Sequence, residues 1–89
     1  MDLLQFVEAF HVEGAKLLDV VESAGEAGGA MEWVIGRVGG YEVYFLWFPT
    51  TRRLVYVVKS GETQREGVIE ARGRLDAIAQ MEKIVRNLR

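Results

Sequence analysis

The sequence predicts an α+β fold, a two-layer sandwich in the order helix, antiparallel sheet of three or four strands, helix. An apolar stripe at helical spacing comes first, three runs rich in Val, Tyr, Phe and Trp follow, and a second helical stripe ends the chain. Strands grouped between two helices are typical of a sheet that carries its helices on one face. Because the chain has 89 residues and no internal boundary, we expect a single domain, residues 1–89.

Residues 2–24 are expected to form the first helix. Apolar positions recur there at alternating spacings of four and three, which places them on one side of a helix: Leu3, Val7, Phe10, Gly14, Leu17 and Val21. Leu4, Val12 and Val20 lie off this stripe and are expected to contact a second subunit. The glycine-rich segment 25–29 is expected to be a flexible break before the sheet.

Three strands are expected at about 30–38, 41–48 and 53–59, because these runs are rich in β-branched and aromatic residues. A two-residue turn at Gly39-Gly40 and a turn centred on residues 50–51 join them. These turns place Arg37 opposite Glu42 and Glu42 opposite Lys59, a charge row in which each pair favours the register by up to ~1 kcal/mol. A turn at 60–63 and a weaker fourth strand at 64–71 follow, with its register left open.

Alternation along these strands separates two faces of the sheet. One of them, which we call the open face, holds Met31, Trp33, Ile35, Arg37, Glu42, Tyr44, Leu46, Phe48, Arg53, Val55, Val57 and Lys59. The opposite face carries fewer charges and is expected to lie beneath the helices; it holds Val34, Val38, Tyr41, Val43, Phe45, Trp47, Leu54, Tyr56 and Val58, with Glu32 at its end. Roughly residues 72–88 have an apolar side and are expected to form the second helix.

Composition restricts the class of protein. The chain has no Cys, 49% hydrophobic residues and a net charge of −2, and so large an apolar fraction in so short a chain predicts an oligomer, a dimer or a tetramer. No apolar run reaches the ~20 residues of a membrane span. The amino terminus also lacks the features of a secretory signal, so we expect a cytoplasmic protein without a membrane partner. The scarcity of Asn, Gln and Cys beside many charged residues is typical of a thermophile.

Residues for catalysis are scarce in this sequence. His11 is the only histidine, and Ser23 and Ser60, the only serines, have no base in a recognisable pattern. A phosphate-binding loop is missing, and the glycines around position 39 belong to a hairpin and not to a strand-to-helix turn. We therefore expect no enzyme, no cofactor and no metal site.

Aromatic and basic residues cluster in the centre of the chain. Seven of the nine aromatic residues lie between Trp33 and Tyr56, and residues 37–74 carry seven bases against four acids. Rings stack on unpaired bases and cations follow the phosphate backbone. The sequence therefore predicts a non-catalytic protein that binds single-stranded DNA or RNA on the open face, through Trp33, Arg37, Tyr44, Phe48, Arg53 and Lys59.

The same face permits a second interpretation. Ile35, Leu46, Val55 and Val57 form an aliphatic patch of a size that is rarely left to water. An assembly or adaptor protein would cover this patch with another subunit, and both functions can coexist if the subunits leave a groove lined by aromatic residues.

The layout resembles that of the small archaeal single-stranded DNA-binding proteins related to ThermoDBP. The resemblance consists of the helix–sheet–helix order, the lack of Cys and the aromatic-rich sheet around Trp33, Tyr44, Phe45, Trp47 and Phe48. It implies an archaeal, thermophilic origin and a single strand bound in an apolar cleft bordered by basic residues. The carboxyl-terminal zipper of the larger members has no counterpart here, which implies that any assembly uses other surfaces.

Overall fold

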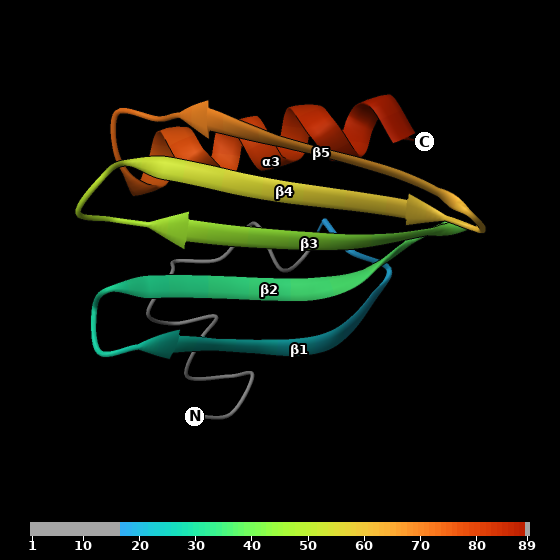
Figure 1. The fold of residues 1–89 in the computed structure, drawn as a ribbon, viewed down its shortest axis with the longest axis horizontal. Helices are drawn as coiled ribbons and strands as arrows, with labels where there is room; N and C mark the ends of the chain where they lie inside the picture. The colour runs from blue at the N-terminus through green and yellow to red at the C-terminus, as the bar shows by residue number, and fades with distance from the viewer. Residues whose placement is uncertain (1–16, 89) are drawn as a thin grey trace.

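The computed structural model describes residues 17–88 of the chain. Five strands follow one another, each antiparallel to the next, and one helix comes after them (Figure 1). The elements are β1 (Val20–Ala27), β2 (Met31–Val38), β3 (Tyr41–Phe48), β4 (Arg53–Ser60), β5 (Thr63–Glu70) and α3 (Arg74–Leu88). The predicted helix–sheet–helix order with three or four strands is therefore wrong, since the fold is a five-stranded meander followed by a carboxyl-terminal helix.

The error lies in the predicted first helix, residues 2–24. Its last residues belong to β1, which pairs with β2 from Val20↔Arg37 to Ala27↔Met31. A register shift between Val21 and Ser23 interrupts this strand, so its apolar residues do not alternate with period two, and the sequence pattern of a strand is hidden. The earlier part of the predicted helix, with His11, Gly14, Leu4 and Val12, lies outside the described residues.

The predicted break at 25–29 is also corrected. Gly25 is a buried residue of β1, and the turn lies further on, where the amide of Ala30 donates to the carbonyl of Ala27 at 2.8 Å. Gly28 and Gly29 have φ angles of 52° and 80°, which glycine adopts without steric cost. The glycine cluster thus contains both a strand position and the turn residues.

The three central strands agree with the predicted ones, and so does their register. Arg37 is opposite Glu42, and Glu42 is opposite Lys59, as the two turns required. The fourth predicted strand is also present as β5, and the pairing Ser60↔Thr63 gives it the register that the sequence left open. The predicted second helix is α3.

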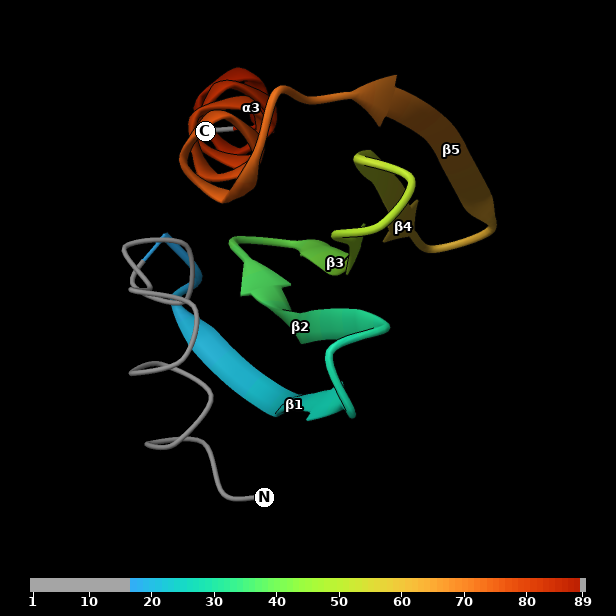
Figure 2. The same cartoon turned by 90° about the vertical axis from the view of Figure 1, so that its left-hand side faces the viewer.

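The core lies between α3 and one face of the sheet (Figure 2). This is the face that was expected beneath the helices, and its apolar side chains are almost fully buried: Val34, Val38, Val43, Phe45, Trp47, Leu54 and Val58. The helix contributes Ala77, Ile78, Met81 and Val85. Burial of apolar side chains on one side of the sheet positions the other side, the open face, away from α3.

Candidate functional site

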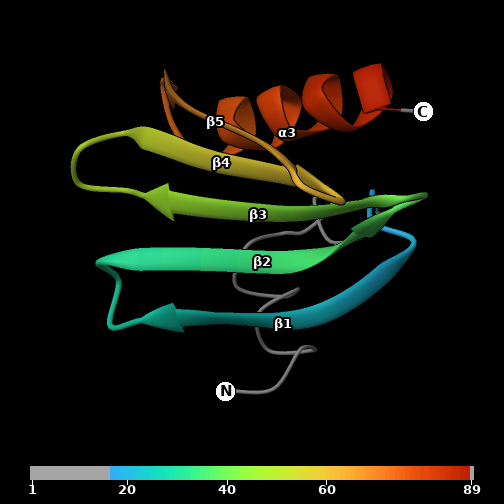
Figure 3. The ribbon, with the colours of Figure 1, turned by 45° about the vertical axis from the view of Figure 1, so that its right-hand side comes forward.

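The open face is an apolar surface that no helix of residues 17–88 covers. In Figure 3, β5 passes in front of α3, so the sheet is viewed from the face opposite the helix. Ten apolar or aromatic side chains lie on this face, most of them half-buried: Val20, Met31, Trp33, Ile35, Tyr44, Leu46, Phe48, Val55, Val57 and Val68. A contiguous apolar surface of this kind is typical of a binding surface.

The six predicted site residues all lie on this face, but they form two separate groups. Phe48 and Arg53 are direct cross-strand partners beside the loop of residues 49–52. Trp33 is opposite Leu46, next to this group. Neither Arg52 nor Arg53 forms an ion pair within residues 17–88. This end of the face therefore offers aromatic rings beside unpaired cations.

The second group, Arg37, Tyr44 and Lys59, lies at the opposite end of the strands, and its members interact with one another or with neighbouring carboxylates. Arg37 Nε lies 2.7 Å from Glu22 Oε1, and Arg37 Nη2 lies 3.6 Å from Glu42 Oε2. Tyr44 donates its hydroxyl to the Glu42 carboxylate, and Lys59 Nζ lies 5.6 Å from the centroid of the Tyr44 ring. The hydrogen bond with Glu22, followed by the charge of that carboxylate, raises the pKa of Arg37. These cations are already engaged within the protein.

Three acids on the open face were missed in the sequence. Glu22 comes from the irregular part of β1, while the register of β5 places Glu66 opposite Val57 and Glu70 opposite Arg53. With Glu42 they make four acids against Arg37, Arg53 and Lys59, a net charge of −1 for the face. The two-residue turn at 61–62 was the signal that could have identified Glu66 and Glu70, since it determines the β5 register.

Trp33 is held in place by the strand beside it. Its direct partner on β1 is Gly25, and a Cβ atom built on Gly25 would lie 2.7 Å from Trp33 Cζ2. Trp33 Nε1 also points to Ser23 Oγ at 3.5 Å. The glycine thus lets the indole lie against the edge strand, where it covers backbone that would otherwise face water.

Within residues 17–88 no group of three or more His, Cys, Asp and Glu side chains converges on a common point that could hold a metal ion. One buried carboxylate, Glu32, is paired with Arg74 and lies on the core face. Over the same residues no helix has the length and apolar character needed to cross a membrane.

Comparisons with known proteins give no relative for this chain. No protein-family model matches it, and no curated protein or solved structure matches it either. The resemblance to the ThermoDBP-related proteins therefore stays one of layout, and the helix–sheet–helix order on which it partly rests is not the order of residues 17–88.

Proposed function

We propose that this protein is a non-catalytic assembly module whose open face binds a second copy of the same chain. The observation that carries the proposal is the row of apolar side chains across all five strands, half-buried on β2, β3 and β4 and exposed on β1 and β5, on a face whose net charge is close to zero. Protein interfaces are depleted of charge at their centre and enriched in aromatic residues and Met. Trp33, Tyr44, Phe48 and Met31 agree with that composition.

The size of the face fits a dimer. Five strands of eight residues, about 4.8 Å apart and rising about 3.3 Å per residue, span roughly 24 by 26 Å. That projects to roughly 600 Å² per subunit before surface relief is added, near the ~800 Å² per partner of a stable interface. Two such sheets pack face to face about 10 Å apart in a sandwich.

The charges at the two ends of the face are compatible with self-association. One end carries Arg37 and Lys59 with Glu42, and the other carries Arg53 beside Glu70. A two-fold symmetric interface brings the same surface from both subunits together. Because each end holds both signs, either relative orientation of the sheets can place opposite charges near each other.

Sedimentation and multi-angle light scattering across micromolar concentrations test this proposal. We expect a mass of twice the 10.0 kDa chain, and we expect Leu46→Lys at the centre of the face to give monomers with unchanged far-ultraviolet circular dichroism. Val57→Lys serves as a second variant on the neighbouring strand. Leu75→Lys is the matched control, because Leu75 is 77% exposed on α3 and off the open face.

Two outcomes would contradict the dimer. A monomer mass for the wild-type protein at every concentration would show that no dimer forms. A folded Leu46→Lys variant that stays dimeric would show that a different surface joins the subunits.

A second candidate function, binding of single-stranded DNA or RNA, is favoured by one observation. Phe48 and Arg53 face each other at one end of the sheet with Trp33 nearby and the exposed Arg52 next in sequence. Stacking contributes about 1–3 kcal/mol per base, while unpaired arginines supply the contacts to phosphate. Fluorescence anisotropy with labelled oligothymidine and with a duplex of equal length tests it, and equal or absent binding at low salt would exclude it.

A further inference from the structure

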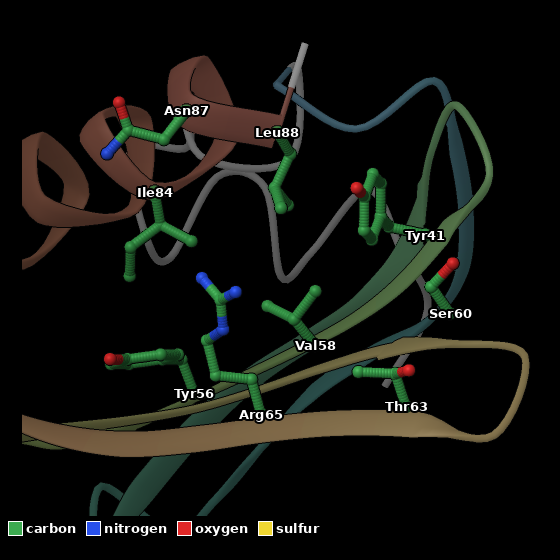
Figure 4. A pocket seen from close by; sticks show the side chains of 9 residues that line it. All are labelled: Tyr41, Tyr56, Val58, Ser60, Thr63, Arg65, Ile84, Asn87 and Leu88. Atoms are coloured by element: carbon green, nitrogen blue, oxygen red, sulfur yellow. The ribbon is translucent and has the colours of Figure 1, made fainter.

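A cavity on the other side of the sheet is independent of the open face. It lies between the last turn of α3 and strands β3, β4 and β5, and it has a volume of about 280 Å³ (Figure 4). This volume lies just below the range of about 300–1,000 Å³ that is usual for small-molecule sites, which limits an occupant to a compound of few atoms. We call it the α3–β5 cavity.

The lining of the cavity is mixed, with Ser60, Thr63 and Asn87 among its residues, and its apolar part faces α3. Val58 forms the floor and is 7% exposed, while Ile84 and Leu88 of α3 lie across from it. The rings of Tyr41 and Tyr56 line the two sides. A hydrocarbon or aromatic body would lose its contact with water on three sides in such a space.

Among the residues 17–88 that line the cavity, Arg65 is the one with a charged side chain. It comes from β5 and extends toward α3 between Tyr56 and Val58 (Figure 4). In the part of the chain that the structure describes, no Asp or Glu lines the cavity and Arg65 has no ion pair. A guanidinium beside apolar walls pairs best with a planar carboxylate, which accepts two parallel hydrogen bonds.

Gly67 determines the shape of the cavity because it leaves room for the Tyr56 ring. Gly67 is the direct partner of Tyr56, and a Cβ atom on Gly67 would lie 2.4 Å from the Tyr56 hydroxyl oxygen. The tyrosine therefore lies across β5. Space is left next to it, and this space is where Arg65 extends.

We propose that the α3–β5 cavity binds a small amphipathic monocarboxylate. Its carboxylate pairs with Arg65, and its apolar body lies on Val58, Ile84 and Leu88. A single cation favours one negative charge over a phosphate dianion. The carbonyls at the end of α3 carry partial negative charge, which places the carboxylate at the β5 side of the cavity and the apolar body at the helix side.

Titrations followed by ¹H–¹⁵N correlation spectra test the proposal, with butyrate, hexanoate and 3-phenylpropionate as the probes. We expect shifts confined to the residues of β3, β4, β5 and α3 around the cavity, with 3-phenylpropionate the tightest because it covers the most apolar surface. The neutral 3-phenylpropanamide should bind about tenfold more weakly, since it loses a charge-assisted hydrogen bond.

Arg65→Gln should reduce affinity for 3-phenylpropionate by a similar factor, about tenfold. Because Arg65 is exposed, the variant is expected to fold. Arg53→Gln is the matched control, which removes an exposed arginine from the opposite face and should leave the affinity unchanged. The proposal fails if none of the three acids shifts these resonances, if the shifts fall on the open face, or if Arg65→Gln binds as the wild type does.

Discussion

The indole of Trp33 on β2 packs directly against Gly25 on β1, where the glycine has no side chain to block it. The two residues are direct partners, and a Cβ atom on Gly25 would lie 2.7 Å from Trp33 Cζ2. Tyr56 and Gly67 repeat this arrangement on the opposite face and at the opposite edge of the sheet. Both edge strands therefore carry a glycine on which an aromatic ring of the inner strand lies, which protects their backbone.

We expect Gly25→Ala to displace the Trp33 ring and to lower the free energy of unfolding by about 1–3 kcal/mol, the usual range for overpacking. Urea unfolding followed by tryptophan emission measures both effects. Gly40→Ala is the control, since no atom lies within 4 Å of its Cβ position and its φ is not in the left-handed region. Equal stability of the two variants would contradict this role of Gly25.

Gly36→Ala should be more damaging than Gly25→Ala. A Cβ atom on Gly36 would lie 2.3 Å from the carbonyl oxygen of Val20, a backbone atom next to the irregular part of β1. A side chain can rotate away, whereas this backbone cannot move without loss of β1 pairing. The expected order of unfolding free energies is Gly40→Ala above Gly25→Ala above Gly36→Ala, measured in one urea series.

The ion pair between Glu32 and Arg74 connects β2 to the first turn of α3. Arg74 Nη2 donates to Glu32 Oε1 at 2.5 Å, the Glu32 side chain is 1% exposed, and its Oε2 has no hydrogen-bond partner. Burial raises the pKa of Glu32 above its ordinary value of 4.5; the hydrogen bond and charge of Arg74 act against this rise, and the nearby charge of Glu26 adds to it. The folded protein thus holds the Glu32 proton more tightly than the unfolded chain does.

A raised pKa means that Glu32 favours the folded state most below pH 4.5 and progressively less as pH rises through the folded-state pKa. We therefore expect the unfolding free energy of Glu32→Gln, relative to that of the wild type, to be higher at pH 7 than at pH 4. Urea unfolding at the two pH values measures the difference. Glu82→Gln removes an exposed carboxylate and is the control for the change in net charge.

Arg74→Met should lower stability at pH 7 because it leaves a buried carboxylate without its partner. Such losses are about 3–5 kcal/mol for fully buried pairs; since the Arg74 side chain is 39% exposed, we expect about 1–3 kcal/mol. The double variant Glu32→Gln/Arg74→Met should recover most of this loss. A double variant no more stable than Arg74→Met alone would mean that the ion pair is not the cause.

If the protein binds nucleic acid, removal of the carboxylates that hold Arg37 should change its affinity for a single strand. The Arg37 guanidinium is now held by Glu22 and Glu42. If the open face binds a single strand, Glu22→Gln combined with Glu42→Gln should tighten oligothymidine binding and steepen the salt dependence by about one phosphate contact. Phe48→Ala should weaken it by about 1–3 kcal/mol. Unchanged affinity in both variants would leave the face as a protein interface alone.

The sequence by itself determined the centre of the molecule. Two turns, at Gly39-Gly40 and around residues 50–51, are local, and with period-two alternation they assign a face to every strand residue between Met31 and Lys59. The buried face and the charge row Arg37–Glu42–Lys59 were therefore predictable. So was α3, because its apolar stripe depends only on residues close together in the sequence.

Only the tertiary structure decided the β1 edge of the sheet, and with it the contribution of Glu22 to the charge of the open face. The segment from Val20 has an apolar pattern compatible with a helix, but its backbone pairs with β2 through an irregular register that no local pattern announces. Glu22 reaches Arg37, fifteen residues away in the sequence, through this pairing. The face of the β5 acids follows from the local turn at 61–62, whereas the irregular pairing of β1 with β2 joins residues far apart in the chain, and such pairing is what a single sequence encodes least directly.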